Sequence, residues 1–141
     1  MKTLRRFAIL LLIAPSLVAA DAAAAPANDT VITPLMEQPL EGLADRVATV
    51  ITVEYAPGAA TPPHTHPAHS IVYVLSGKIE MQVKGGPAVM LGTGQTFYEK
   101  PSDVHVVSRN ASTTEPAKFL VVFIKSAGAP LLEPASGTDA E

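Results

Sequence analysis

Hydrophobic and polar residues alternate along much of the middle of the chain, which predicts strands rather than helices. From Arg46 to Tyr55, the β-branched or aromatic residues Val47, Thr49, Ile51, Val53 and Tyr55 recur at every second position. Lys78–Lys84 repeats the pattern, with Ile79, Met81 and Val83 expected to point inward. Two other segments, Ser70–Leu75 and Ala117–Lys125, are apolar at consecutive positions. Such segments are typical of strands that are covered on both faces.

Turn residues divide these apolar segments at short intervals. Glycine, proline and serine separate the strands at Pro57-Gly58, Ser76-Gly77 and Gly85-Gly86-Pro87. Three further short strands are expected at residues 88–91, 95–99 and 104–109. About seven strands with turn signals between them, and no convincing helix, indicate an all-β sandwich or barrel over residues 46–125.

The start of the chain has the pattern of a secretory signal peptide, which we assign to residues 1–20. A basic beginning is followed by an apolar run over residues 7–18 and then by small residues. The apolar run is shorter than the ~20 residues that a membrane-spanning helix needs, which favours cleavage over a retained anchor. Cleavage would leave Asp21 at the new N-terminus, with cleavage a few alanines later as the alternative. We therefore expect a periplasmic or secreted protein without membrane attachment.

The segments that flank the predicted barrel have a different composition. Residues 21–45 begin with an alanine-rich lead-in and continue as an extended arm, in which Pro34, Pro39 and Gly42 disfavour a helix. Residues 126–141 are rich in glycine, proline, serine and acidic residues, which predicts a flexible tail.

Charge and cysteine content restrict the class of partner. The chain has 10 basic and 13 acidic residues, and without Lys2, Arg5 and Arg6 the balance is 7 to 13, a formal charge of −6. An acidic protein lacks the basic face that nucleic acid binding requires. The sequence contains no cysteine, so stability must come from the core, from dimerisation or from a bound metal.

The candidate chemistry lies in the histidines. Three of the four, His64, His66 and His69, lie within six residues, and His105 follows far downstream. Residues two apart in an extended chain point the same way, so His64 and His66 present two imidazoles on one face, a face that Ser70 shares and His69 does not. With His105 as a third ligand they would form a metal site with open positions. The alternative is an exposed loop that is rich in histidine.

The same residues resemble the two motifs of the cupin family, over roughly residues 46–125. The first motif matches with every spacing kept, at Gly58, His64, His66, Ser70 and Gly77. The second is degraded and corresponds to Gly94, Lys100, Ser102, His105 and Asn110, with lysine and serine where proline and glycine are usual. The resemblance implies a jelly-roll barrel, or double-stranded β-helix, that binds one divalent transition metal through His64, His66 and His105.

One departure from the family pattern concerns the metal site. Cupins usually supply a glutamate at the position that Ser70 occupies, so the resemblance implies three histidine ligands, with Ser70 and His69 nearby. It does not distinguish manganese, zinc, iron or nickel. It also leaves the catalytic residue unassigned, with Glu99, Tyr98, Tyr73 and His69 as the proton-transferring side chains available. For Glu99, composition favours an ordinary surface carboxylate.

Three uses of such a site remain open. The first is a metal-dependent enzyme, a dioxygenase, isomerase or lyase, that acts on a small organic molecule. The second is a metal or small-ligand binding protein without turnover. The third is a structural homodimer without metal, which the resemblance implies through outer strands and the N-terminal arm.

Overall fold

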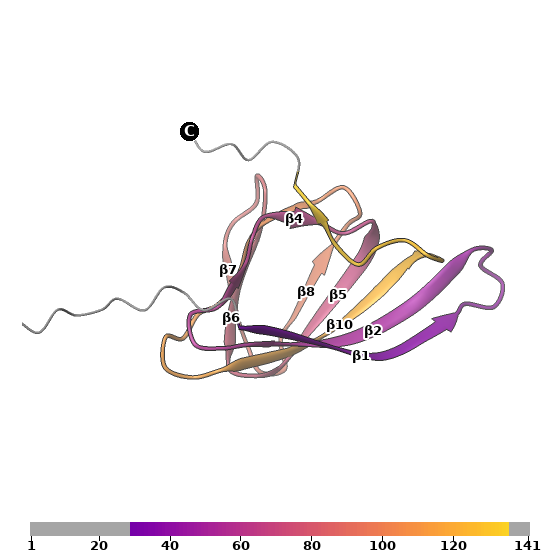
Figure 1. Ribbon diagram of the computed structural model, residues 1–141. Coiled ribbons are helices and arrows are strands. Elements are labelled where there is room, and N and C mark those ends of the chain that lie inside the picture. The colour runs from indigo at the N-terminus through magenta and orange to yellow at the C-terminus, as the bar shows by residue number, and fades with distance from the viewer. Residues whose placement is uncertain (1–28, 136–141) are drawn as a thin grey trace, which may run out of the picture.

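The computed structural model describes residues 29–135, and every regular element in that part of the chain is a β-strand (Figure 1). The strands are β1 (Thr30–Pro39), β2 (Arg46–Tyr55), β3 (Ala60–Thr61), β4 (His64–Thr65), β5 (Ala68–Ser76), β6 (Lys78–Val83), β7 (Val89–Gly92), β8 (Thr96–Glu99), β9 (Val104–Asn110), β10 (Ala117–Ser126) and β11 (Glu133–Pro134). Within the described range, no helix has the length and apolar character needed to cross a membrane. The predicted signal peptide, most of the predicted lead-in and residues 136–141 lie outside the described residues.

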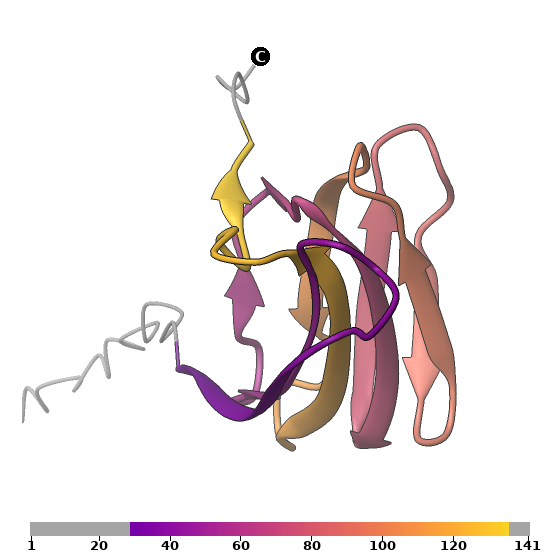
Figure 2. The same cartoon turned by 90° about the vertical axis from the view of Figure 1, so that its right-hand side faces the viewer.

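Two antiparallel sheets form the barrel. The first sheet has the order β1-β2-β10-β5-β8, and the second has the order β11-β4-β9-β6-β7, with β3 also paired to β9. The two views show the sheets facing one another, with β4 above and β1, β2 and β10 below in the first view (Figures 1 and 2). The predicted all-β jelly-roll barrel is confirmed.

The inward faces of the long strands make the core. On β2 and β10 every second residue is buried, and the pairing sets Phe119 opposite Val53 and Val121 opposite Ile51. From the other sheet, Ile79 and Met81 of β6 are buried, as their alternation predicts. Burying such side chains contributes roughly 1.5–3 kcal/mol each, so the alternation itself drives the two sheets together.

The outer face of the first sheet differs from the prediction for β5. Its inward residues, among them Val72 and Val74, are buried, but Ile71, Tyr73 and Leu75 are exposed on the opposite side. Ser70–Leu75 is therefore covered on one face only within a single chain. Burial inside the barrel therefore does not explain why Ile71, Tyr73 and Leu75 are apolar.

The extended arm forms an edge strand. β1 pairs with β2 from Thr30 opposite Tyr55 to Pro39 opposite Val47, with a bulge between Pro34 and Met36. The apolar side chains of Val31, Leu35 and Met36 on this arm are exposed within one chain.

The last described residues turn back onto the barrel. The Ala127 N–H donates to the Asp45 carbonyl, and β11 pairs with β4, Glu133 opposite Thr65. Residues 127–135, which the sequence assigns to a flexible tail, therefore form a strap beside the histidine loop. We call this segment the C-terminal strap.

The turn after β5 is fixed by close backbone packing. Gly77 has a φ of 75°, and a Cβ built there would lie 2.6 Å from the Pro116 carbonyl oxygen. The Asn110 amide donates to the carbonyls of Ala56 and Glu115 and thereby ties the neighbouring loops together. The motif residues Gly77 and Asn110 thus have structural roles at one end of the barrel.

Candidate metal centre

Strand pairing brings the histidines of the two motifs together. β4 and β9 pair antiparallel with His64 directly opposite His105, and their ring centroids are 5.0 Å apart. His66 follows two residues after His64, and the centroids of these two rings are 4.7 Å apart. The nitrogens that the three side chains offer lie within 4.8 Å of one another. The structure therefore assembles the three side chains that the sequence singles out.

Hydrogen bonds to backbone carbonyls determine which nitrogen of the His64 and His66 rings keeps a free lone pair. His64 Nδ1 lies 2.8 Å from the Pro62 carbonyl oxygen, and His66 Nδ1 lies 2.5 Å from the Leu131 carbonyl oxygen. A carbonyl only accepts, so both Nδ1 atoms carry the hydrogen and both neutral rings keep a lone pair on Nε2. These two Nε2 atoms are 3.1 Å apart. Two facing lone pairs repel one another unless a cation lies between or beside them.

Burial keeps the imidazoles neutral. It lowers the pKa of His64, lowers that of His66 to about 4 and lowers that of His105 to about 3, where repulsion from the other two rings adds to the effect. Neither ring nitrogen of His105 has a hydrogen-bond partner among the described residues. Buried polar atoms are seldom left without a partner, so the nitrogens of His105 indicate a missing ligand or ion. Neutral imidazole is the form that binds metals.

Glu99 brings a carboxylate to the same place, from the opposite sheet. It ends β8, is only 2% exposed, and its Oε2 lies 3.6 Å from both His66 Nε2 and His105 Nδ1. Burial raises the pKa of Glu99 to about 7, with a further contribution from Asp103. The interpretation of Glu99 as a surface carboxylate is therefore wrong. Glu99 lies two residues after Phe97 on β8, so both side chains point to the same, inward face. This spacing was the signal in the sequence for the orientation of Glu99.

The other predicted residues fall on two different faces. Ser70 is fully buried on the inner face of β5, and its hydroxyl has no hydrogen-bond partner within residues 29–135. His69 lies on the outer face, exposed, with its Nδ1 2.7 Å from the Tyr98 hydroxyl. Tyr73 and Tyr98 are exposed as well. The structure does not bring His69, Tyr73 or Tyr98 to the histidine cluster.

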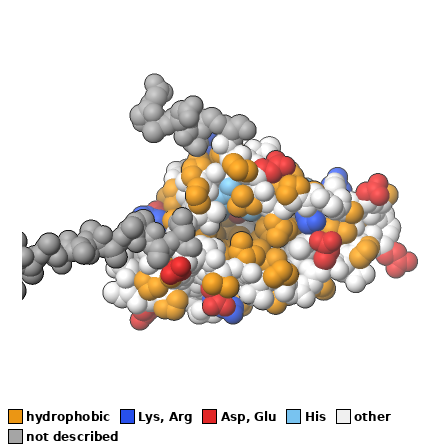
Figure 3. Space-filling view, in the orientation of Figure 1, with side chains coloured by type: hydrophobic (Ala, Val, Ile, Leu, Met, Phe, Trp, Pro, Cys, Tyr) orange, Lys and Arg blue, Asp and Glu red, His pale blue; other side chains and the backbone are white. Residues whose placement is uncertain are grey.

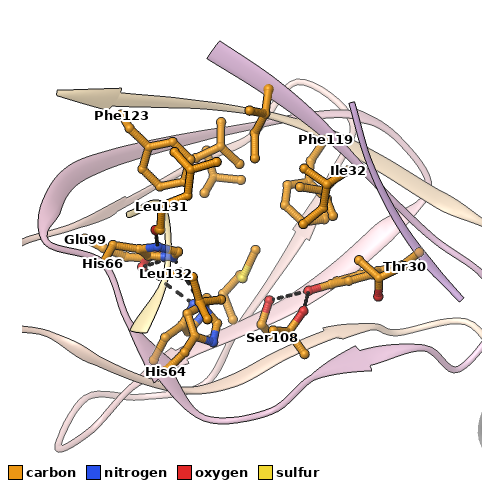
Figure 4. Close-up of a pocket in the computed structure, with 18 residues that line it drawn as sticks. Thr30, Ile32, His64, His66, Glu99, Ser108, Phe119, Phe123, Leu131 and Leu132 are labelled. Carbon is orange, nitrogen blue, oxygen red and sulfur yellow. Dashed lines mark hydrogen bonds and ion pairs between the residues drawn. The ribbon is translucent and has the colours of Figure 1, made fainter. Parts of the chain in front are cut away.

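The cluster lies at one end of an apolar cavity of about 80 Å³ inside the barrel. Both sheets line the cavity, with Met81 from one and Phe119 and Phe123 from the other, and Leu131 and Leu132 of the C-terminal strap lie beside the histidines (Figure 4). The Phe123 ring packs against His66, with centroids 5.0 Å apart. Histidine is visible at the bottom of a hollow that hydrophobic side chains surround (Figure 3).

A cluster of hydroxyl groups lines another part of the cavity. The Tyr55 hydroxyl lies 2.5 Å from Thr61 Oγ1 and 2.8 Å from Ser108 Oγ, so the three groups share hydrogen bonds. Ser108 lies away from His66 in the close-up (Figure 4). A ligand in the cavity therefore meets imidazoles and a carboxylate on one side and hydroxyl groups on another, with apolar walls between them.

The donor set fits a divalent transition metal. Atoms about 2.1 Å from one ion lie at most about 4 Å apart, which is close to the spread of the three histidine nitrogens. Three imidazoles suit zinc, iron, nickel and copper, and a carboxylate extends the set to manganese. These residues could thus form a three-histidine metal centre with open positions.

Comparisons with known proteins agree with this geometry. A family model described as "Cupin domain" matches residues 51–123. The germin-like protein subfamily 2 member 4 of Arabidopsis thaliana is 30% identical over 92 residues, which cover 54% of this chain and 42% of that protein. The matched region thus spans less than half of that curated relative.

Solved structures share the fold. The DMSP lyase DddQ of Ruegeria pomeroyi superimposes with a TM-score of 0.62 at 22% identity, covering 79% of this chain and 54% of the lyase. The polyketide cyclase RemF of Streptomyces resistomycificus gives a TM-score of 0.61 at 22% identity, covering 93% and 89% of the two chains. At such identities the likeness concerns the fold alone.

Proposed function

Because this chain belongs to the cupin family, we propose that it binds one divalent metal ion through His64, His66 and His105 and acts as a metal-dependent enzyme on a small organic molecule. One observation carries the proposal: the Nε2 lone pairs of His64 and His66 face one another at 3.1 Å beside His105, whose ring nitrogens accept and donate no hydrogen bond within residues 29–135. A cation removes this repulsion, and the low pKa values of His66 and His105 disfavour a proton in that role.

The cavity supports a small and largely apolar substrate. Its volume of about 80 Å³ is well below the ~300–1,000 Å³ of pockets that hold drug-sized ligands. When bound, the metal would polarise an oxygen of the substrate or bind dioxygen, which suits an oxidoreductase of the dioxygenase kind or an isomerase. Phe123 and the C-terminal strap would exclude bulk water, and the Tyr55 hydroxyl cluster would hold a second polar group of the substrate.

A metal or small-ligand binding protein without turnover is the second candidate. The main reason for it in the sequence is the absence of the usual motif glutamate, since Ser70 stands in its place. The buried carboxylate of Glu99 at 3.6 Å from two histidines weakens that reason. The enzyme proposal is therefore the stronger of the two.

The metal is tested first. We expect purified protein to carry about one first-row metal per chain, measured by mass spectrometry of the metal content, and His105→Ala to lose it. His69→Ala is the matched control, because His69 is an exposed histidine on the outer face of the barrel. Equal metal content in the wild type and His105→Ala would contradict the proposal.

Turnover is tested next, on protein whose metal content is known. Oxygen uptake and proton magnetic resonance are followed with a panel of small phenols, diketones and hydroxy acids. Uptake of oxygen supports a dioxygenase, and a change of substrate without uptake supports an isomerase. A metal-loaded protein that binds these molecules and transforms none of them would support the binding protein instead.

A further inference from the structure

Ser70 and Glu99 are neighbours across two strands. β5 and β8 pair antiparallel with Ser70 directly opposite Glu99, and both side chains point to the inside of the barrel. Side chains in this relation have Cβ atoms about 4.5–5.5 Å apart, so the two occupy adjoining space on one face of the sheet. The longer Glu99 side chain reaches His66 and His105 from the strand next to that of Ser70.

The position of the Glu99 carboxylate matches that of a ligand. Its Oε2 is equidistant, at 3.6 Å, from a nitrogen of His66 and a nitrogen of His105. Two atoms bound to the same ion at about 2.0–2.2 Å lie roughly 3–4 Å apart, depending on the angle between them. A carboxylate oxygen at this point therefore adds a fourth protein atom around the centre that the imidazoles surround.

The charges of the barrel give a second, independent argument. Among residues 29–135, the Lys and Arg side chains in ion pairs contact other carboxylates: Arg109 pairs with Glu80, Lys118 with Glu54 and Lys125 with Glu37. Within the same range, the ion-pair contacts of Glu99 are to His66 and His105, whose imidazoles burial keeps neutral, and the charge of Asp103 further disfavours the ionised form of Glu99. A buried carboxylate without a counter-charge is costly. A divalent cation among the three histidines would supply that counter-charge.

We propose that Glu99 is the fourth protein ligand of the metal, and that it supplies from β8 the carboxylate that Ser70 does not supply from β5. The donor set is then three imidazoles and one carboxylate, as a glutamate at position 70 would give, but its oxygen approaches from the neighbouring strand. One carboxylate beside a divalent ion leaves the site with a net charge of +1. This lower charge moderates the attraction of the site for anions. This inference rests on the proposed metal binding.

The test measures metal affinity of the full chain after removal of metal with a chelator. Mn²⁺ and Zn²⁺ are titrated calorimetrically into the wild type, Glu99→Gln, and the exchange variant Ser70→Glu with Glu99→Ser. Glu99→Gln is expected to weaken Mn²⁺ binding at least about tenfold, since even outer partners of ligands are typically worth 10–100-fold. The exchange variant is expected to recover most of this loss. Glu54→Gln, on the outer face of the same sheet, is the control and should bind like the wild type.

Coordination is observed separately with Co²⁺ as the probe. Loss of a ligand changes the energy and intensity of the visible bands of bound Co²⁺, whereas a merely structural role of Glu99 leaves them as in the wild type. Glu99→Asp, whose carboxylate is one methylene shorter, provides a milder variant should Glu99→Gln fail to fold. It should weaken Mn²⁺ binding and shift the Co²⁺ spectrum.

The outcomes separate this inference from the proposed function. A wild type that binds none of the three ions contradicts the metal proposal, and the ligand assignment with it. A wild type that binds metal while Glu99→Gln binds it equally well, with the same Co²⁺ spectrum, overturns the assignment of Glu99 alone.

Discussion

His66 donates its Nδ1 hydrogen to the carbonyl oxygen of Leu131, 65 residues further along the chain, at 2.5 Å. This bond ties a candidate metal ligand to the C-terminal strap. It sets the tautomer of His66, because the hydrogen on Nδ1 leaves Nε2 free to face His64 and the metal. The β11–β4 pairing, with Pro134 opposite His64, holds the strap in the position that this bond needs.

Removal of the strap should therefore weaken metal binding. A chain that ends at Pro130 lacks the Leu131 carbonyl, and we expect its affinity for Zn²⁺ to fall about 10–100-fold, the usual effect of losing the hydrogen-bond partner of a histidine ligand. The measurement is a competition titration with a coloured chelator. A chain that ends at Ala135 keeps the bond and should bind like the full chain. Equal affinity of both truncated chains would show that the strap does not orient His66.

In the metal-free protein, the contribution of Glu99 to stability should be lost as the pH rises. Burial raises the pKa of Glu99 from 4.5 to about 7, so the folded state favours the protonated carboxyl. The associated stability is present below pH 4.5 and is lost as the pH rises through about 7. Since one pKa unit corresponds to about 1.4 kcal/mol, the wild type should lose about 2–4 kcal/mol relative to Glu99→Gln across this range.

Urea unfolding of both variants in a chelator at pH 5, 6, 7 and 8 provides the comparison. The three buried histidines contribute a pH dependence of the opposite sign, since their lowered pKa values mean that stability is lost on acidification. The part of that contribution that does not depend on Glu99 cancels between the two variants, so the difference between them reports the titration of Glu99 together with its coupling to His66 and His105. A difference that stays constant with pH would contradict the assignment of a raised pKa.

Two glycines of the first motif should differ in their tolerance of a side chain. Gly58 and Gly77 have similar φ values, 73° and 75°, but a Cβ at Gly58 meets nothing within 4 Å whereas one at Gly77 lies 2.6 Å from the Pro116 carbonyl oxygen. Gly58→Ala should cost about 1–2 kcal/mol for the left-handed backbone alone. Gly77→Ala should cost clearly more, because the loop at Pro116 must also move. Unfolding in urea measures both, and equal losses would argue against close packing at Gly77.

The exposed outer face of the first sheet suggests an assembly. One row of residues across the sheet is apolar and runs over Met36, Val50, Val122, Ile71 and Tyr98. Three strands of 10 residues, β5 with 9 and β8 with 4, at ~3.3 Å per residue and ~4.8 Å per strand, give this face about 700 Å², close to the ~800 Å² that each partner of a standard interface buries. We propose that a second copy of the chain covers this face and makes a homodimer.

Charge on this face should separate the subunits. Ile71→Lys, at the middle of the row, is expected to convert the dimer to a monomer in analytical ultracentrifugation, because a lysine there would lose water without gaining a partner. Leu43→Lys is the control, since Leu43 is also exposed but lies in the turn between β1 and β2. A wild type that sediments as a monomer at all concentrations would contradict the homodimer.

The sequence by itself determined the long strands of the barrel and the identity of three clustered side chains. Alternation in Arg46–Tyr55 and Lys78–Lys84 is a local property, and burial of one face of each strand follows from it. The spacing of His64 and His66 likewise puts both on one side of an extended chain, whatever the rest of the fold does.

The tertiary structure alone decided what surrounds those side chains. Glu99 reaches the histidines because β8 pairs with β5 on the opposite sheet, and Leu131 reaches His66 because the chain turns back after β10. Both contacts depend on the register between distant strands, and no local pattern encodes that register. Periodicity also predicts which face of a strand each residue lies on, but not whether another element packs on that face. For this reason Ile71 and Tyr73 were expected to be buried and are exposed within one chain.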